Sequence, residues 1–456
     1  MEVTLAQILQ SREDRAREQQ ALLAAYGCPL ICFTMNIAGP VKVTPLIERA
    51  FREGLSALDR RLPPDCVRYR GITTPITGCQ AMYCAALPAA QLKEICVSIE
   101  EATPLGRLFD MDVLDIDSTK LERKGERSCI VCGVPGRACA ASRAHPVPQL
   151  QEATRRLIQA HFFPEDIGAL AVQSLLDEAN TTPKPGLVDR RNNGSHRDMD
   201  IGTFTASAHA LGPYFRQCVQ IGQETADAAP EQTFSLLRQA GLEAEKAMYR
   251  TTGGVNTHKG AIYTMGILCG SLGRLWTPER PIAETERILS ETARISRQAA
   301  QADFQNISDC PTAGERLYLD RGLTGIRGEA AAGLPSVREI GLPVYRGCLG
   351  RGLSPNDAGA VTLLHLIAGV CDTNLYHRGG AEGARYAAEA AAALLSAPTI
   401  ARLEALDDAF IARRLSPGGC ADLLAATYFL DRLSKCRDDA QDTSPTVLYE
   451  LRSGSY

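Results

Sequence analysis

The apolar pattern of this chain changes shortly after His145, and this change constrains the fold more than any other feature. Before it, the apolar runs Pro29 to Met35 and Leu108 to Leu114 are typical of strands, and Pro45 to Leu58 has the spacing of an amphipathic helix. After it, helical spacing recurs and clear strand alternation hardly reappears. We therefore predict an α/β domain followed by a larger all-α domain, with a boundary near residues 150–166.

The same reasoning places the remaining elements. Ile95 to Ile99 is a further predicted strand of the first domain. The predicted helices of the second part are, in chain order, Leu150 to Ala160, Asp166 to Ala179, Gly202 to Leu211, Thr233 to Tyr249, His258 to Leu275, Ile282 to Ala302, Asp357 to Cys371 and Ala381 to Leu395.

Composition excludes several classes of protein. A length of 456 residues favours two or more domains. A formal net charge of −4 implies no basic face for nucleic acid. No apolar run approaches the roughly 18 residues of a membrane-spanning helix, and the first residues lack the apolar segment of a signal peptide. We therefore expect a cytoplasmic protein with no nucleic-acid or membrane partner, whose 16 cysteines are reduced.

The stretch from Pro183 to Asp200 contains the densest group of chemically active side chains. Its acids and imidazole, which can hold a divalent metal or transfer protons, are Asp189, His196, Asp198 and Asp200. Its cations, which can neutralise phosphates, include Lys184, Arg190 and Arg191. Metal and phosphate together indicate a nucleotide. Asp200 has a structural alternative as the N-cap of the helix that starts at Gly202.

Two later clusters have a similar character. The glycine-rich turn Thr252 to Gly260 leads into a helix, whose N-terminus suits a phosphate held by Asn256, His258 and Lys259. An ordinary capped helix is the alternative there. The second cluster contains Asp372, His377 and Arg378. We place Asp372 at a helix C-terminus, where a carboxylate is unfavourable unless a cation lies nearby.

The first domain contains two aspartates, Asp110 and Asp112, separated by one residue. On a strand they would share one face, which suits carboxylates that bind magnesium during phosphoryl transfer. Arg107 just before them and Lys42 after the first strand are candidate phosphate ligands. A half-exposed edge strand and a solvated turn lysine explain the same residues without function.

A third pattern in this domain is Cys129, Cys132, Cys139 and His145. Three thiolates and one imidazole can complete a tetrahedral zinc shell. The six-residue spacing between Cys132 and Cys139 is short for a zinc ribbon. The alternative is a group of small buried residues beside a basic phosphate-binding loop.

The motifs of this chain resemble those of two known families. Residues 166–436 resemble triphosphoribosyl-dephospho-CoA synthase through TPKPGLVDRRNNGSHRDMD (Thr182–Asp200), TGGVNTHKGAI (Thr252–Ile262), GLPSVREIGLPVYR (Gly333–Arg346) and DTNLYHRGG (Asp372–Gly380). The N-terminal third resembles apo-citrate lyase phosphoribosyl-dephospho-CoA transferase through SREDRAREQQ (Ser11–Gln20), FTMNIAGPVK (Phe33–Lys42), PLGRLFDMDVLD (Pro104–Asp115) and CIVCGVPGRACAASRAH (Cys129–His145).

The resemblance implies a fused, bifunctional transferase, with a transferase domain over residues 1–160 and a synthase domain over 166–456. The synthase domain would join the ribose 2′-hydroxyl of 3′-dephospho-CoA to C1′ of ATP and release adenine. The transferase domain would then attach the product to a serine of the citrate lyase acyl carrier subunit and release pyrophosphate. A nucleotidyltransferase-like fold is implied for the first domain.

The resemblance also distributes roles among the candidates. Asp189, His196, Asp198 and Asp372 would provide acid, base or magnesium-binding groups for adenine displacement, as in glycoside cleavage. Magnesium would be bound by Asp110 and Asp112 in one domain and by Asp198 and Asp200 in the other. The substrates of the synthase domain, including the triphosphate of ATP, would be bound by Lys184, Arg190, Arg191, Asn256, His258, Lys259, His377 and Arg378.

Two other functions compete with this interpretation. A metal-dependent nucleotide hydrolase would use water in place of the CoA hydroxyl group, and residue types alone do not separate it from the transferase. A cysteine-rich module attached to a helical ligand sensor would be no enzyme at all. Neither alternative explains charged, glycine-bearing clusters in both domains.

Overall fold

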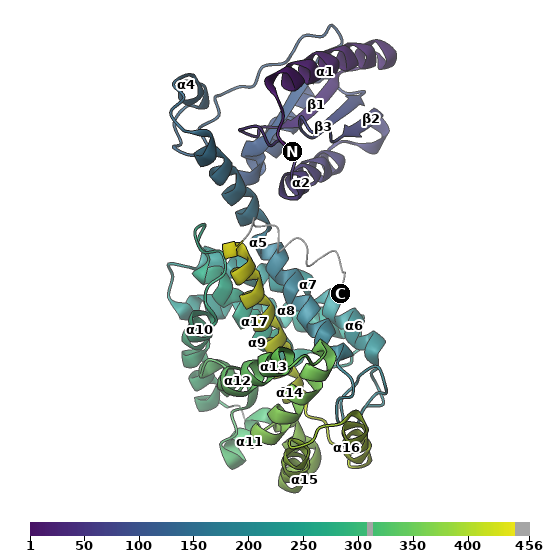
Figure 1. The fold of residues 1–456 in the computed structure, drawn as a ribbon, viewed down its shortest axis with the longest axis vertical. Coiled ribbons are helices and arrows are strands. Elements are labelled where there is room, and N and C mark those ends of the chain that lie inside the picture. Colours follow the sequence, from purple (N-terminus) through teal and green to yellow (C-terminus); the bar gives the residue numbers. More distant parts are fainter. Residues whose placement is uncertain (308–312, 443–456) are drawn as a thin grey trace. The chain divides into compact units, whose positions relative to one another are not determined.

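The computed structural model describes residues 1–307 and 313–442, and it divides into two compact units, Met1–Phe162 and Phe163–Tyr456 (Figure 1). The division falls within one helix, α5 (Val147–Asn180). Sequence spacing predicts two separate helices here, Leu150 to Ala160 and Asp166 to Ala179, but the chain continues through Pro164 without a break in α5.

The first unit is built on a four-stranded antiparallel sheet with the strand order β2-β3-β1-β4. The strands are β1 (Leu30–Met35), β2 (Val67–Thr73), β3 (Gln80–Ala85) and β4 (Phe109–Leu114). The helices are α1 (Leu5–Tyr26), α2 (Pro45–Arg61), α3 (Ala89–Ala102) and the short α4 (Gly136–Ala141), with 3-10 turns at Pro64–Cys66 and Pro104–Leu108. The first unit therefore combines a sheet with helices, as predicted, and all of its strand pairs are antiparallel.

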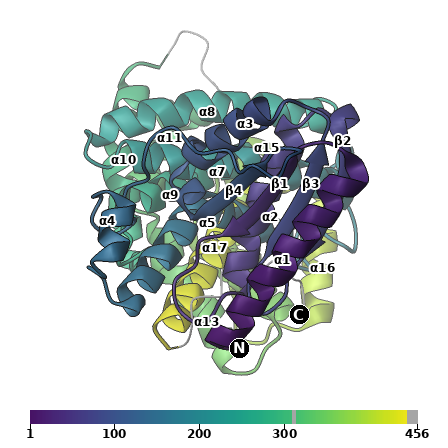
Figure 2. The same ribbon diagram turned by 90° about the horizontal axis from the view of Figure 1, so that it is seen from above.

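Both faces of the central strands are covered. Phe33 of β1 packs with α2 and α3 residues such as Phe51 and Leu92, while Cys32 packs with Leu22 of α1. Figure 2 shows α1 lying along β1 and β3. This double burial explains why β1 reads as a continuous apolar run.

One predicted strand is wrong. Ile95 to Ile99 belongs to α3, whose buried residues include Leu92, Cys96 and Ile99. These positions recur every three to four residues, which is the period of a helix face, and a short window hides that period.

Apart from an isolated bridge between Thr277 and Arg280, the regular secondary structure in the described part of the second unit is helical. After α5 its helices are α6 (Ile201–Ala210), α7 (Gly212–Glu224), α8 (Pro230–Thr251), α9 (Lys259–Leu275), α10 (Thr285–Gln305), α11 (Ala313–Arg321), α12 (Gly325–Ala331), α13 (Leu342–Gly350), α14 (Pro355–Gly369), α15 (Thr373–Leu394), α16 (Ile400–Ala412) and α17 (Gly418–Asp442), with a π-turn at Val337–Gly341. The larger helical part predicted from the sequence is confirmed.

Helix α9 is the central helix of this unit. Ala261 to Gly273 is buried except at Tyr263, and two glycine positions let α9 cross α7 closely. A Cβ atom on Gly222 would lie 2.1 Å from the carbonyl oxygen of Gly270. The crossing fixes α9, and therefore the start of α9, relative to the helices around it.

In the part of the chain that the structure describes, no single helix is long and apolar enough to cross a membrane. The bent pair α14 and α15 passes that test jointly, by length and composition only.

Candidate active sites

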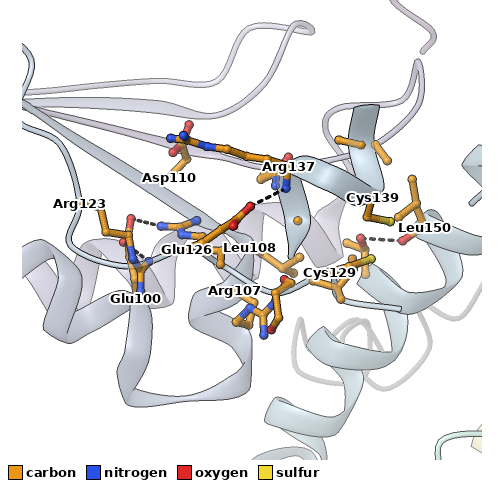
Figure 3. Close-up of a pocket in the computed structure, with 18 of the residues that line it drawn as sticks. Glu100, Arg107, Leu108, Asp110, Arg123, Glu126, Cys129, Arg137, Cys139 and Leu150 are labelled. Carbon is orange, nitrogen blue, oxygen red and sulfur yellow. Dashed lines mark hydrogen bonds and ion pairs between the residues drawn. The ribbon is translucent and has the colours of Figure 1, made fainter. Parts of the chain in front are cut away.

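The first unit contains a cavity of about 1170 Å³ beside β4 and the segment that follows it (Figure 3). Its lining includes many charged side chains. The acids are Glu100, Asp110, Asp112, Glu122 and Glu126, and the bases are Lys93, Arg107, Lys120, Arg123, Arg127, Arg137 and Arg143. Cys129, Cys139 and His145 also line this cavity. The cavity therefore combines carboxylates with an excess of cations, which suits a polyphosphate.

The two aspartates of β4 lie on one face, as predicted. Phe109, Met111 and Val113 are buried, whereas Asp110 is exposed and Asp112 half-buried, so the strand alternates. Asp112 Oδ2 lies 2.6 Å from Nζ of Lys120. Asp110 lines the cavity without an ion pair in the described structure, so its carboxylate is available to a ligand.

Glu100 of α3 is a buried carboxylate that sequence reasoning missed. Oε1 accepts the backbone N–H of Met111 at 2.9 Å and contacts Arg127, and Oε2 lies 3.1 Å from Nη1 of Arg123. This group connects α3, β4 and the segment after β4. The ordinary helical context of Glu100 contained no signal of that role.

The remaining basic candidates differ in their surroundings. Arg107 donates to the backbone oxygen of Ser128, and Arg137 and Arg143 line the cavity. Lys42 donates to the carbonyl oxygen of Ile37 and is not among the described residues that line the cavity. Burial, with the nearby Arg12, lowers the pKa of Lys42.

The four ligand-type residues Cys129, Cys132, Cys139 and His145 come together. Their candidate ligand atoms all lie within 4.8 Å of one another, and Sγ of Cys132 lies 4.0 Å from Sγ of Cys139. His145 directs Nδ1 to Oε1 of Gln149 at 3.0 Å, while its buried Nε2 has no hydrogen-bond partner. An oriented imidazole with a free nitrogen is what a metal-binding histidine requires. The first unit thus has a possible Cys/His metal site.

The pKa values of two thiols in this cluster are shifted in opposite directions. Burial, reinforced by the neighbouring thiols, raises the pKa of Cys139 to about 12. The backbone N–H of Val134 instead lowers the pKa of Cys132.

The second unit contains a cavity of about 1050 Å³ surrounded by the loops before α6, α9, α15 and α17. Nine of the predicted site residues line it, namely Lys184, His196, Asp198, Asn256, His258, Lys259, Asp372, His377 and Arg378. Segments almost 200 residues apart in the sequence therefore meet at one cavity.

Four other predicted residues are not among the described lining residues: Asp189, Arg190, Arg191 and Asp200. Asp189 is buried, and its carboxylate accepts the backbone N–H groups of Lys184, Arg191 and Asn192. It therefore stabilises the loop itself.

The other three of these residues have structural contacts as well. Arg191 is paired with Asp407 at 2.6 Å and with Asp408 at 3.0 Å on α16, and Arg190 donates to Asn356. Asp200 caps α6 by accepting the N–H of Thr203 at 2.8 Å, which is the structural alternative that the sequence offered.

Asp372 is not at a helix C-terminus. Helix α14 ends at Gly369, and Asp372 is the N-cap of α15, where its Oδ1 accepts N–H groups of Asn374 and Leu375. Its Oδ2 accepts the N–H of Cys420 at 2.8 Å. The prediction extended α14 by two residues, which reversed the expected electrostatics. Burial still raises the pKa of Asp372.

His196 and Arg378 form one contact at this cavity. Nη2 of Arg378 lies 3.2 Å from Nδ1 of His196, and Nε2 of His196 lies 3.0 Å from the hydroxyl group of Ser416. Burial and the charge of Arg378 lower the pKa of His196 to about 4. His196 is therefore neutral at physiological pH and can exchange hydrogen bonds with a substrate.

Lys184 is fully buried and its Nζ lies 2.5 Å from Oε1 of Glu178 on α5. Burial raises the pKa of Glu178, although Lys184 opposes that shift. His258 is also buried, with Nδ1 at 2.8 Å from the hydroxyl group of Ser207. Burial and the charge of Lys184 lower the pKa of His258 to about 3.

Sequence reasoning missed two segments and three carboxylates of this cavity. The segments are Gly322 to Gly328 and the loop Ser416 to Gly419 before α17, and the carboxylates are Glu178, Glu329 and Asp422. The run Ser-Pro-Gly-Gly before an apolar helix was the available signal, because paired glycines permit close approach of the backbone to a ligand. Glu178 and Asp422 sit within helices and gave no local signal.

The described residues of each unit thus form a charged cavity, which is the arrangement of an enzyme with two sites. Residues 164–440 match the family model of ATP:dephospho-CoA triphosphoribosyl transferase, and residues 3–161 match that of apo-citrate lyase phosphoribosyl-dephospho-CoA transferase. The chain belongs to the ATP:dephospho-CoA triphosphoribosyl transferase family, fused to a domain of the second family. Both of these families are families of transferases.

Relatives support the fusion across nearly the whole chain. The protein CitXG of Haemophilus influenzae is 37% identical over 94% of this chain and 96% of its own length. CitXG of Leuconostoc mesenteroides subsp. cremoris is 29% identical over 94% of this chain and 97% of its own length. A probable 2-(5''-triphosphoribosyl)-3'-dephosphocoenzyme-A synthase of Vibrio cholerae is 45% identical over 59% of this chain and 89% of its own length.

Proposed function

We propose that this chain makes and then attaches the prosthetic group of citrate lyase. The second unit joins 3′-dephospho-CoA to the ribose of ATP and releases adenine, and the first unit transfers the phosphoribosyl-dephospho-CoA group to a serine of the acyl carrier subunit, releasing pyrophosphate. The observation that carries this proposal is the presence of one charged cavity in each unit, in the order of the two matched families. Both reactions take place in the cytoplasm.

In the synthase cavity, cations and neutral histidines surround the place for ATP. Arg378 and Lys259 supply charge for the triphosphate, and His196 and His258 offer neutral hydrogen-bonding groups. Asp198 is the predicted magnesium ligand that lines the cavity. Bound magnesium would neutralise triphosphate charge, which is the chemistry such an ion supplies.

We propose positioning roles for Asp372 and Asp189 in place of the acid or base roles expected from the sequence. Their oxygens accept backbone N–H groups of the loops that form the site, so we assign them positioning roles. Lys184 is likewise held by Glu178 at the cavity wall.

In the transferase cavity, Asp110 and Asp112 are the proposed magnesium ligands. Their shared face on β4, directly after Gly106 and Arg107, supports a nucleotidyltransferase-like fold for this unit. Arg137 and Arg143 line the same cavity and would hold the phosphates of the intermediate. The serine of the carrier subunit would then attack the α-phosphate, with pyrophosphate as the leaving group.

We propose zinc as the metal of the Cys129, Cys132, Cys139 and His145 cluster. Three sulfur atoms and one imidazole nitrogen form a donor set that zinc prefers, and a closed set of four protein ligands is typical of a structural site. The cluster lies in the segment that contains Arg137 and Arg143. Zinc would therefore hold two phosphate-binding side chains in place.

The first experiment measures adenine release by the purified chain with ATP and magnesium, with and without 3′-dephospho-CoA. Release that depends on dephospho-CoA supports glycosyl transfer. Adding the citrate lyase acyl carrier subunit should then produce modified carrier and pyrophosphate. Release of phosphate without adenine would contradict the synthase and favour a nucleotide hydrolase.

A further inference from the structure

Asp422 is a carboxylate of the synthase cavity that lies outside all the motifs recognised in the sequence. It belongs to the first turns of α17 and lines the cavity. Its carboxylate accepts the backbone N–H of Ala261 in the first turn of α9. A Cβ atom on Gly260 would lie 1.9 Å from Oδ2 of Asp422, so only glycine allows α9 to start this close to the carboxylate.

The groups around Asp422 provide no cationic partner for its carboxylate. Those facing it are Glu178 on α5, Asp372 before α15 and the thiol of Cys420 on its own helix. The cations that line the cavity have other partners. Lys184 is paired with Glu178, and Lys259 lies 3.0 Å from Glu245. Arg327 lies 3.4 Å from Glu315, and Arg378 lies 3.2 Å from Nδ1 of His196. In the described part of the chain Asp422 forms no ion pair. Burial, with the charges of Glu178 and Asp372, raises the pKa of Asp422 well above its usual range.

A second observation indicates that a ligand binds next to this carboxylate. His258 precedes α9 by one residue, is 3% exposed and lines the same cavity. Nδ1 of His258 is bonded to Ser207, but its buried Nε2 has no hydrogen-bond partner. Leaving such a polar atom unpaired in the interior is unfavourable, so a substrate atom is the expected partner.

We propose that Asp422 is the catalytic base of the synthase reaction, taking the proton of the dephospho-CoA 2′-hydroxyl group as that oxygen attacks C1′ of ATP. This inference rests on the proposed function of the second unit. Asp422 is suited to the role because it lines the cavity at the start of α9 and forms no ion pair among the described residues, and burial also raises its affinity for a proton. Nε2 of His258 contacts the same bound substrates.

The step balances without a further reactant. The bond between O2′ and C1′ forms, the bond between C1′ and the adenine nitrogen breaks, and the hydroxyl proton moves to Asp422. That proton then passes to adenine, which leaves as the neutral base, and Asp422 returns to its ionised form.

The test is adenine release by the full chain with Asp422→Asn, beside the unchanged chain and Asp408→Asn. Asp408 is an exposed carboxylate on α16 and does not line the cavity. We expect kcat to fall by roughly 10²–10⁴-fold in Asp422→Asn, with KM for both substrates within about threefold. In the unchanged chain kcat should fall as the pH drops through the pKa of Asp422, and this acidic limb should disappear in the variant.

Two further measurements separate a base from a structural residue. The Asp422→Asn chain should still transfer purified intermediate to the carrier subunit, and formate should restore adenine release by Asp422→Ala but not change that of Asp408→Ala. Retained kcat in Asp422→Asn, or loss that formate does not restore, would overturn the inference. If the unchanged chain releases no adenine, the proposed function fails instead.

Discussion

The two cavities differ in how they manage charge, although both are suited to phosphates. In the first unit, Asp110 and Asp112 lie on the open face of an edge strand and arginines supply most of the cations. In the second unit, Glu178 and Asp372 are buried between helices, and the two cavity histidines with lowered pKa values, His196 and His258, are neutral. An exposed strand face lets a ligand set the charge, whereas a helical interior sets the protonation state before any ligand arrives.

The variant Asp110→Asn provides the strongest test of this difference between the two cavities. Removing one carboxylate of the proposed magnesium pair should lower pyrophosphate release by roughly 10³-fold, because metal stabilisation of transition-state charge is worth several kcal/mol. Adenine release should not change, since that reaction belongs to the other unit. The matched control is Asp117→Asn, an exposed turn residue that does not line the cavity. Equal loss in both variants would contradict the assignment.

The contrast in burial predicts a contrast in stability. Glu178→Gln leaves the buried Lys184 ammonium without its partner, so the free energy of unfolding of the helical unit should fall by about 3–5 kcal/mol. Chemical denaturation monitored by circular dichroism measures this. The exposed pair of Glu243 and Lys246 offers the control, and Glu243→Gln should change that free energy by less than about 1 kcal/mol. A small effect of Glu178→Gln would mean that water reaches Lys184.

The neutral histidines predict an acid-sensitive helical unit. His258 has a folded pKa of about 3 and an unfolded value near 6.5, so the unfolded chain binds the extra proton between these pH values. Stability is therefore present above pH about 6.5 and is lost as the pH falls, by about 2 kcal/mol between pH 7 and pH 5 for this residue. His258→Gln should remove that part of the slope, and the exposed His209→Gln should not. An unchanged slope in His258→Gln would show that its imidazole protonates in the folded state.

The smallest expected effect on activity is that of removing a proposed zinc ligand beside the first cavity. Cys132→Ser should abolish stoichiometric zinc binding, measured by elemental analysis, and lower carrier modification by at least about tenfold, since Arg137 and Arg143 lose their support. Adenine release should be unaffected. Cys371→Ser, which replaces an exposed cysteine outside the cluster, is the control for metal content. Unchanged zinc content in Cys132→Ser would contradict the proposed ligand set.

The sequence predicted local features well where the pattern is strongly periodic. The alternation of β4 and the N-cap at Asp200 follow from neighbouring residues, and both are confirmed. The strand predicted at Ile95 to Ile99 is wrong because five residues cannot distinguish a buried helix face from a strand. Asp372 was misplaced because helix ends are uncertain by one or two residues, and here that shift exchanges the C-terminus of one helix for the N-terminus of the next.

What the sequence determined by itself was the order of the two units and the residue types that could carry their chemistry, because periodicity and motif spacing are properties of neighbours along the chain. Only the tertiary structure decided which of those residues share a cavity. It placed Asp189 and Arg191 in loop-stabilising contacts, and it brought Glu178 and Asp422 to the site from helix interiors. The physical reason is that burial, ion pairing and pKa depend on segments far apart in sequence, which meet only when the helices pack.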